Sequence, residues 1–139
     1  MTKSTISEVV GYPPNYKEIE AKFTVGPKTI FAWGDKIYNP SGTRITKDLL
    51  AHEEVHMKQQ AGEPEKWWKR YLDDSEFRLD QEAKAYGRQY QYICSTNRNS
   101  NFRFQVLMGL SLYLAGPMYG YITNIGHATE LIKIYAESV

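Results

Sequence analysis

The chain has 139 residues, of which 42% are hydrophobic and 24% charged, and its 17 basic residues nearly balance its 16 acidic ones. This length and composition fit a single globular domain, residues 1–139, with a hydrophobic core of its own. The near-zero net charge gives no sign of the clustered positive charge that nucleic acids and anionic membranes attract, so we expect neither as a partner.

The N-terminal part predicts an arm followed by a β-hairpin. Residues 1–16 are rich in turn-forming residues and lack the apolar run of a secretory signal, so we expect an arm over the body of a cytoplasmic protein. Cys94 is the only cysteine, which excludes an internal disulfide and fits a reducing compartment. Lys22–Asn39 predicts two short strands, because Gly34-Asp35 lies between aromatic and β-branched residues.

The middle of the chain predicts three helices. Thr46 is suited to be the N-cap of a helix that runs to Gln60, and Gly62 then stops it. Pro64 opens a second helix from a first-turn position. A third helix is expected over about Glu76–Ile93, after a short acidic break.

The C-terminal part contains an apolar stretch and a last helix. Phe104–Thr129 has no Asp, Glu, Lys or Arg, but its strongly apolar portion, Val106–Ala115, ends at Gly116-Pro117. A membrane span needs about 20 apolar residues, so this shorter portion favours a buried helix; the alternative is that it anchors the chain to a membrane. Ala128–Ala136 predicts the last helix. A small strand unit followed by helices is typical of an α+β fold in which helix predominates.

Residues 52–56 read His-Glu-Glu-Val-His, an H-E-x-x-H motif. On a helix, residues four apart lie on one face, so the imidazoles of His52 and His56 can converge on one Zn²⁺ at about 2.0–2.1 Å. Glu53 projects toward the open side of the metal, where it can take a proton from zinc-bound water. The motif therefore predicts a zinc site with Glu53 as the general base.

A chance match to this short motif would leave two solvated histidines on an amphipathic helix. Two observations favour the metal site. The motif lies in a segment with helix signals at both ends, and Leu49, Leu50 and Val55 give that helix a side to bury. The chain has three histidines in all, and two of them form the motif.

A catalytic zinc site needs a third protein ligand and keeps a fourth position open. Residues 57–62 supply no histidine, so we expect a carboxylate from the long helix that follows: Glu76 or Glu82. Glu76 has Asp80 one turn later to orient a ligand histidine, but it lies where a Glu commonly serves as a first-turn charge. Glu82 lies mid-helix beside small alanines, and we favour it; the alternative is a surface Glu that pairs with Arg78.

The segments HEEVHMKQQ, WWKRYL and FRLDQEAKAY resemble the core of the Glu-zincins, the thermolysin-like metallopeptidases. They are similar in particular to compact metallopeptidase-like proteins of bacteriophages and their hosts, over roughly Thr29–Tyr86. The resemblance implies a minimal zincin-like domain whose Phe31–Tyr38 strand borders the metal cleft and holds an extended peptide by β-augmentation. It also implies Glu53 as catalytic base and three zinc ligands: His52, His56 and Glu82.

The sequence departs from the thermolysin pattern around the third ligand. That pattern has an Asn before the ligand Glu and an Asp four residues after it, whereas this chain has Gln81 and Tyr86 at those offsets from Glu82. The partner that orients His52 is therefore unassigned. Thermolysin spacing itself would favour Glu76.

An oxyanion stabiliser is also expected, and Tyr119 or His127 could supply it. The alternatives are that Tyr119 is a packing residue and that His127 belongs to the first turn of the last helix. The resulting prediction is zinc-dependent hydrolysis of a peptide or protein substrate. Its rival is a catalytically silent zinc-binding structural or interaction protein of the same fold.

Overall fold

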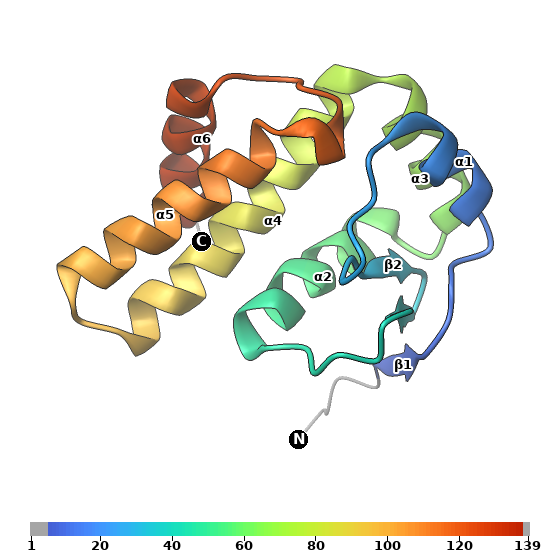
Figure 1. The fold of residues 1–139 in the computed structure, drawn as a ribbon, viewed down its shortest axis with the longest axis horizontal. Helices are drawn as coiled ribbons and strands as arrows, with labels where there is room; N and C mark the ends of the chain where they lie inside the picture. Colours follow the sequence, from blue (N-terminus) through green and yellow to red (C-terminus); the bar gives the residue numbers. More distant parts are fainter. Residues whose placement is uncertain (1–5, 138–139) are drawn as a thin grey trace.

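A small sheet and a larger set of helices make up the computed structural model, which describes residues 6–137 (Figure 1). The predicted α+β class, with helix predominant, is confirmed. In chain order the elements are β1 (Ser7–Val9), α1 (Tyr16–Lys22), β2 (Phe31–Trp33), β3 (Lys36–Tyr38), α2 (Lys47–Gln60), α3 (Pro64–Asp73), α4 (Ser75–Thr96), α5 (Ser100–Leu114), the 3₁₀ turn η1 (Pro117–Tyr119) and α6 (Ile125–Glu137).

The sheet has the strand order β1-β3-β2. β2 and β3 form the predicted antiparallel hairpin, with Ala32 opposite Ile37, and Gly34 turns the chain at φ +64°. This left-handed conformation favours glycine, which has no Cβ to clash. β1 adds to the other edge of β3 in parallel, with Glu8 opposite Ile37. The side chain of Ile37 is fully buried, so the sheet has an apolar face against the helices.

Two expectations for the N-terminal part are wrong. Residues 1–5 of the predicted arm lie outside the described part of the chain. Ser7–Val9 form β1 in the sheet, and Tyr16–Lys22 forms α1, which the sequence pattern did not predict. The segment from Phe23 to Ile30 is not a strand. Phe23 ends α1 and is buried in the core, and Val25 and Ile30 line a cavity beside α2, so the apolar character of this segment serves packing without strand pairing.

The predicted helix boundaries agree closely with the structure in the middle of the chain. Thr46 is the N-cap of α2, which ends at Gln60 and turns off through Ala61 at φ 49° and Gly62 at φ 79°. Pro64 opens α3. Helix α4 is longer than predicted and begins at Ser75, where the Asp74 carboxylate accepts the Phe77 N–H at 3.1 Å and caps the first turn.

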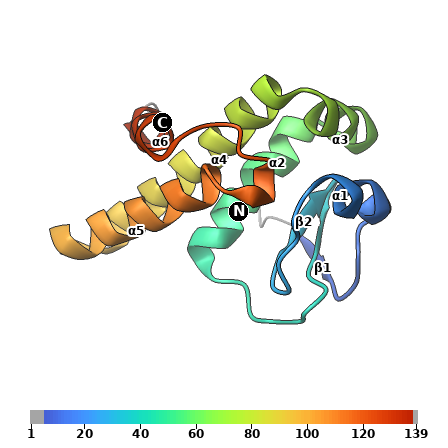
Figure 2. The ribbon, with the colours of Figure 1, turned by 45° about the horizontal axis from the view of Figure 1, so that its top comes forward.

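Helix α4 is the centre of the helical part and packs against α2, α3, α5 and α6 (Figures 1 and 2). Its small residues permit this. Ala83 and Ala85 are fully buried, and a Cβ placed on Gly87 would lie 2.6 Å from the Cβ of Tyr135 on α6. The close approach of α4 and α6 therefore depends on a glycine at position 87.

Helix α5 carries the apolar stretch of the sequence and lies beside α4 (Figure 2). Leu107, Leu110 and Leu114 point into the core, whereas Phe104 and Leu112 are exposed. Among residues 6–137, no helix combines the length and the apolar character needed to cross a bilayer.

Candidate metal centre

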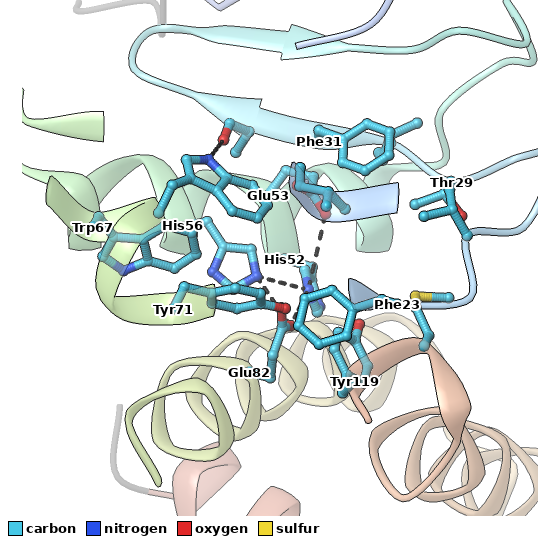
Figure 3. Close-up of a pocket in the computed structure, with 16 residues that line it drawn as sticks. Phe23, Thr29, Phe31, His52, Glu53, His56, Trp67, Tyr71, Glu82 and Tyr119 are labelled. Atoms are coloured by element: carbon cyan, nitrogen blue, oxygen red, sulfur yellow. Dashed lines mark hydrogen bonds and ion pairs between the residues drawn. The ribbon is translucent and has the colours of Figure 1, made fainter. Parts of the chain in front are cut away.

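Two helices bring the chemistry-bearing side chains together. α2 presents His52, Glu53 and His56, and α4 presents Glu82 opposite them (Figure 3). All four are buried, with 3%, 5%, 5% and 4% of their surface exposed. The two histidines lie on one face of α2 because their i,i+4 spacing is about one helical turn. A buried carboxylate among imidazoles is costly to desolvate, so this group is a candidate functional site.

The three candidate ligand atoms form a nearly equilateral triangle. His52 Nε2 lies 3.2 Å from His56 Nε2 and 3.2 Å from Glu82 Oε1, and His56 Nε2 lies 3.1 Å from the same oxygen. Ligands at about 2.0–2.1 Å from a tetrahedral zinc ion are about 3.3 Å apart. The donor atoms therefore already have the separation that a small divalent cation requires, and this buried group could bind a metal ion.

The structure distinguishes the two carboxylate candidates by position. Glu82 is buried against both imidazoles, so the alternative of a surface Glu is wrong. Arg78, its expected partner in that alternative, donates to the backbone carbonyls of Tyr71 and Tyr119. Glu76 is exposed in the first turn of α4. Asp80 accepts hydrogen bonds from Tyr135 and Lys84 and does not orient a histidine of this group.

A glutamine side chain lies against the Nδ1 atom of each imidazole. Gln89 Oε1 lies 3.0 Å from His52 Nδ1, and Gln59 Oε1 lies 2.8 Å from His56 Nδ1. An amide oxygen only accepts, so each ring donates from Nδ1, and its Nε2 is the nitrogen that faces the other candidate ligands. Gln59 is held in turn by donating to the backbone carbonyl of Gln81 at 3.1 Å.

The carboxylate of Glu82 is oriented by a tyrosine. The Tyr71 hydroxyl donates to Glu82 Oε2 at 2.6 Å, which leaves Oε1 facing the two imidazoles. Burial, followed by the Glu82 charge, raises the pKa of Tyr71, so this hydroxyl keeps its proton and remains a donor at neutral pH. All three candidate ligands thus have a second polar contact that fixes the direction of the coordinating atom.

The charges of His56 and Glu82 are coupled. Burial lowers the pKa of His56, but the charge of Glu82 and its hydrogen bond more than offset this and raise that pKa from 6.5 to about 9. Burial raises the pKa of Glu82, but the charge of His56 and the hydrogen bonds from both imidazoles bring it well below its usual value. At neutral pH Glu82 is therefore ionised and His56 carries a proton that a metal ion would displace.

Glu53 differs from Glu82 in its environment. Its Oε2 lies 3.9 Å from His52 Nε2, close to the triangle but outside it. Burial raises its pKa, the two histidines lower it less strongly, and the Glu82 charge raises it further, so the net pKa lies above the usual value. A carboxylate with a raised pKa beside a metal site is a suitable proton acceptor near neutral pH.

A pocket opens beside this group, and its walls are largely apolar and aromatic (Figure 3). Thr29, Ile30 and Met118 line both this pocket and an adjoining one. His52 and Glu53 also line both, so the two cavities meet at the candidate site. The apolar wall residues of the first pocket are Ile19, Phe23, Val25, Ile30, Phe31, Ala32, Trp67, Trp68 and Met118.

The two oxyanion candidates lie in different places. Tyr119 is buried, lines both cavities with His52 and Glu53, and lies with its hydroxyl 2.7 Å from that of Tyr86. Burial raises the pKa of Tyr119, so it retains its proton. His127 is exposed in the first turn of α6, away from both cavities, as the alternative interpretation expected.

The free edge of β2 is partly occupied by side chains. Gln60 accepts the Gly34 N–H at 2.6 Å and donates to the Ala32 carbonyl at 2.8 Å, and Trp68 Nε1 donates to the same carbonyl at 3.0 Å. The resemblance implies one Phe31–Tyr38 strand along the cleft, but this segment is the β2–β3 hairpin, and only β2 borders the pocket, through Phe31 and Ala32. A peptide added to this edge would find the Ala32 carbonyl already bonded.

Sequence reasoning missed the residues that orient the ligands. Asp48 lies one turn before His52, Gln59 lies three residues after His56, and Gln89 lies two turns after Glu82 on α4. These spacings place Asp48 and Gln59 on the histidine face of α2 and Gln89 on the Glu82 face of α4, which is the signal that could have drawn attention to them, although it does not pair Gln89 with His52. Amides are common on helix surfaces, and this weakens the signal.

Comparison with protein-family models, with curated proteins and with solved structures found no match to this chain.

Proposed function

We propose that the protein is a zinc-dependent hydrolase of peptide bonds. The observation that carries the proposal is the buried triangle of His52, His56 and Glu82, with the Glu53 carboxylate 3.9 Å from one of its corners. Two imidazole nitrogens and one carboxylate oxygen form a donor set that is usual for catalytic zinc, and three protein ligands leave a fourth position for water or substrate. The implied resemblance to Glu-zincins agrees with these roles.

Each residue has a distinct part in the proposed reaction. His52, His56 and Glu82 would hold the zinc ion, which would supply a Lewis acid to polarise a carbonyl and to activate a water molecule. Glu53 accepts a proton from the attacking water at its carboxylate and returns it to the leaving amine. Tyr119, whose raised pKa keeps its hydroxyl protonated, donates to the oxygen that becomes negative.

The walls of the pocket favour a peptide as the substrate. They are apolar and aromatic next to a few buried polar groups, which is the usual composition of a pocket that binds side chains. The Phe31–Trp33 strand borders the pocket and offers backbone groups to an extended chain, except at the Ala32 carbonyl.

The second candidate is a zinc-binding structural or interaction protein without turnover. Two observations favour it. Every member of the site is at least 95% buried. The side chains of Gln60 and Trp68 also occupy part of the free edge of β2. A zinc ion enclosed in this way would stabilise the packing of α2 on α4. Cleavage of a mixed peptide library by the zinc-loaded protein distinguishes the two candidates.

Zinc binding should follow pH in a defined direction. Protein purified without added zinc or nickel should hold about one zinc ion per chain. Below the His56 pKa of about 9, the metal must displace a proton, so affinity should rise about tenfold per pH unit between pH 7 and 8.5. Competition with a chelator at several pH values measures this slope.

The exposed His127 supplies the control for this titration. His127→Gln should leave both the stoichiometry and the slope unchanged, because this side chain lies away from the site. An affinity that does not change with pH would contradict ligation by His56, and a folded protein that takes up no zinc would contradict the proposal itself.

Tyr119→Phe should lower kcat by about 100-fold with little change in KM, because losing one oxyanion donor costs about 10²–10³-fold in kcat. The measurement is steady-state cleavage of a peptide selected from the library. Tyr121→Phe is the matched control, since Tyr121 is two residues away and 72% exposed. Equal kcat values for Tyr119→Phe and the parent would assign Tyr119 to packing.

A further inference from the structure

His52 is hydrogen-bonded to the buried amide of Gln89, which in turn is hydrogen-bonded to the carboxylate of Asp48. Gln89 Oε1 lies 3.0 Å from His52 Nδ1, and Gln89 Nε2 donates to Asp48 Oδ2 at 2.9 Å. A carboxylate can only accept, so Asp48 requires the NH₂ group of Gln89 on its side. The amide oxygen must then face His52. The orientation of the amide follows from this chemistry alone.

The positions of these residues in the fold explain why they meet. Asp48 and His52 are one turn apart on α2, so both face α4 where the two helices pack (Figure 1). Gln89 comes from α4 and has 6% of its surface exposed. Its side chain bridges the two residues of α2, and both of its polar ends are used.

We propose that Asp48 and Gln89 act as a relay that fixes His52 in the tautomer with Nδ1 protonated, which turns its Nε2 lone pair toward His56 and Glu82. Gln89 is then a positioning residue for a metal ligand, and Asp48 positions Gln89. The inference rests on the proposed metal binding. It assigns the partner of His52 that the sequence left open, because Tyr86 contacts the His52 ring only edge-on, with centroids 4.4 Å apart.

The relay places a neutral group against the imidazole and the negative charge one residue further away. On the other side of the ring, two carboxylates lie near His52 Nε2: Glu82 at 3.2 Å and Glu53 at 3.9 Å. If residue 48 were an amide and residue 89 a carboxylate, the hydrogen bonds from residue 89 to His52 and to residue 48 could both still form, with the charge and the amide exchanged between the two positions.

The first test removes the acceptor without changing the volume greatly. Gln89→Met should weaken zinc binding by about 10–100-fold, the usual effect of losing the partner of a ligand histidine. Gln91→Met is the control on the same helix, because Gln91 accepts from Arg88 and contacts no candidate ligand. Chelator competition gives the affinities, and thermal melting of each metal-free variant reports folding.

The second test exchanges the two groups. Asp48→Asn/Gln89→Glu should bind zinc within about threefold of the parent, because the carboxylate of residue 89 can accept from both His52 Nδ1 and the new amide. Gln89→Glu alone is the control, because its carboxylate would face the Asp48 carboxylate, which cannot donate, across the contact that the Gln89 amide now makes at 2.9 Å. This single variant should bind zinc more weakly than the exchanged pair.

Nitrogen NMR of histidine-labelled protein reads the tautomer directly, and the chain has three histidines to assign. In protein without zinc, above the His56 pKa of about 9, the parent and the exchanged pair should carry a proton on His52 Nδ1, and Gln89→Met should show a mixture of the two tautomers. This readout does not need zinc, so it separates failure of the relay from failure of metal binding.

Two outcomes would overturn the relay. One is a Gln89→Met variant with the affinity and the His52 tautomer of the parent. The other is an exchanged pair that folds but binds zinc as weakly as Gln89→Met. If Gln89→Met does not fold, the tautomer and affinity of the exchanged pair decide the matter.

Discussion

Glu82→Ala should weaken zinc binding by more than 100-fold. The carboxylate is the one anionic corner of the ligand triangle, and losing only an orienting partner of a ligand already costs about 10–100-fold. It also leaves the protonated His56 without its buried counter-charge, so the pKa of His56 should fall toward its usual value. Chelator competition and metal analysis after dialysis measure the loss of zinc.

Glu76→Ala is the matched control on the same helix. Glu76 is exposed in the first turn of α4, so its removal should change zinc affinity by less than about twofold and cost only a few tenths of a kcal/mol as a lost first-turn charge. If Glu76→Ala lost zinc and Glu82→Ala kept it, the ligand assignment would have to be exchanged.

Glu53→Gln should retain zinc and the fold but cleave peptides about 10²–10⁴-fold more slowly, which is the usual cost of losing a general base. Glu53 lies beside the ligand triangle and is not one of its corners, so the metal does not depend on it. An amide of the same shape cannot accept the proton of the attacking water. The measurement is library cleavage at matched zinc content.

Glu54→Gln is the internal control for this variant. Residue 54 is about 100° further round α2 and lies on a cavity with Lys58, Lys84 and Arg88, away from the metal centre. Its cleavage rate should stay within about threefold of the parent. Equal cleavage by the parent and Glu53→Gln would contradict the proposed mechanism, and no cleavage by any zinc-loaded variant would favour the structural role.

The helix that carries the site was predictable because its signals are local. Thr46, Gln60 and Gly62 mark where α2 begins and ends, and the i,i+4 spacing of His52 and His56 sets their common face whatever surrounds the helix. The hairpin turn at Gly34 was predictable for the same reason. The α+β class followed from the order of these local units.

The N-terminal region was mispredicted because packing and pairing use the same residue types. Phe23, Val25 and Ile30 suit a strand by composition, but in the fold they cover the pocket beside α2 without strand partners. β1 has three residues, and its pairing with β3 joins residues about 30 positions apart, so no local sequence pattern predicts this pairing.

By itself, the sequence determined the helical pair of histidines, the adjacent Glu53 and the boundaries of the helix that presents them. Only the tertiary structure decided which carboxylate faces them. Glu76 and Glu82 belong to one helix, and the packing of α4 across α2 buries Glu82 and leaves Glu76 exposed. The same packing brings Gln89 to His52, because a hydrogen bond between two helices depends on their relative placement, which no spacing within either helix specifies.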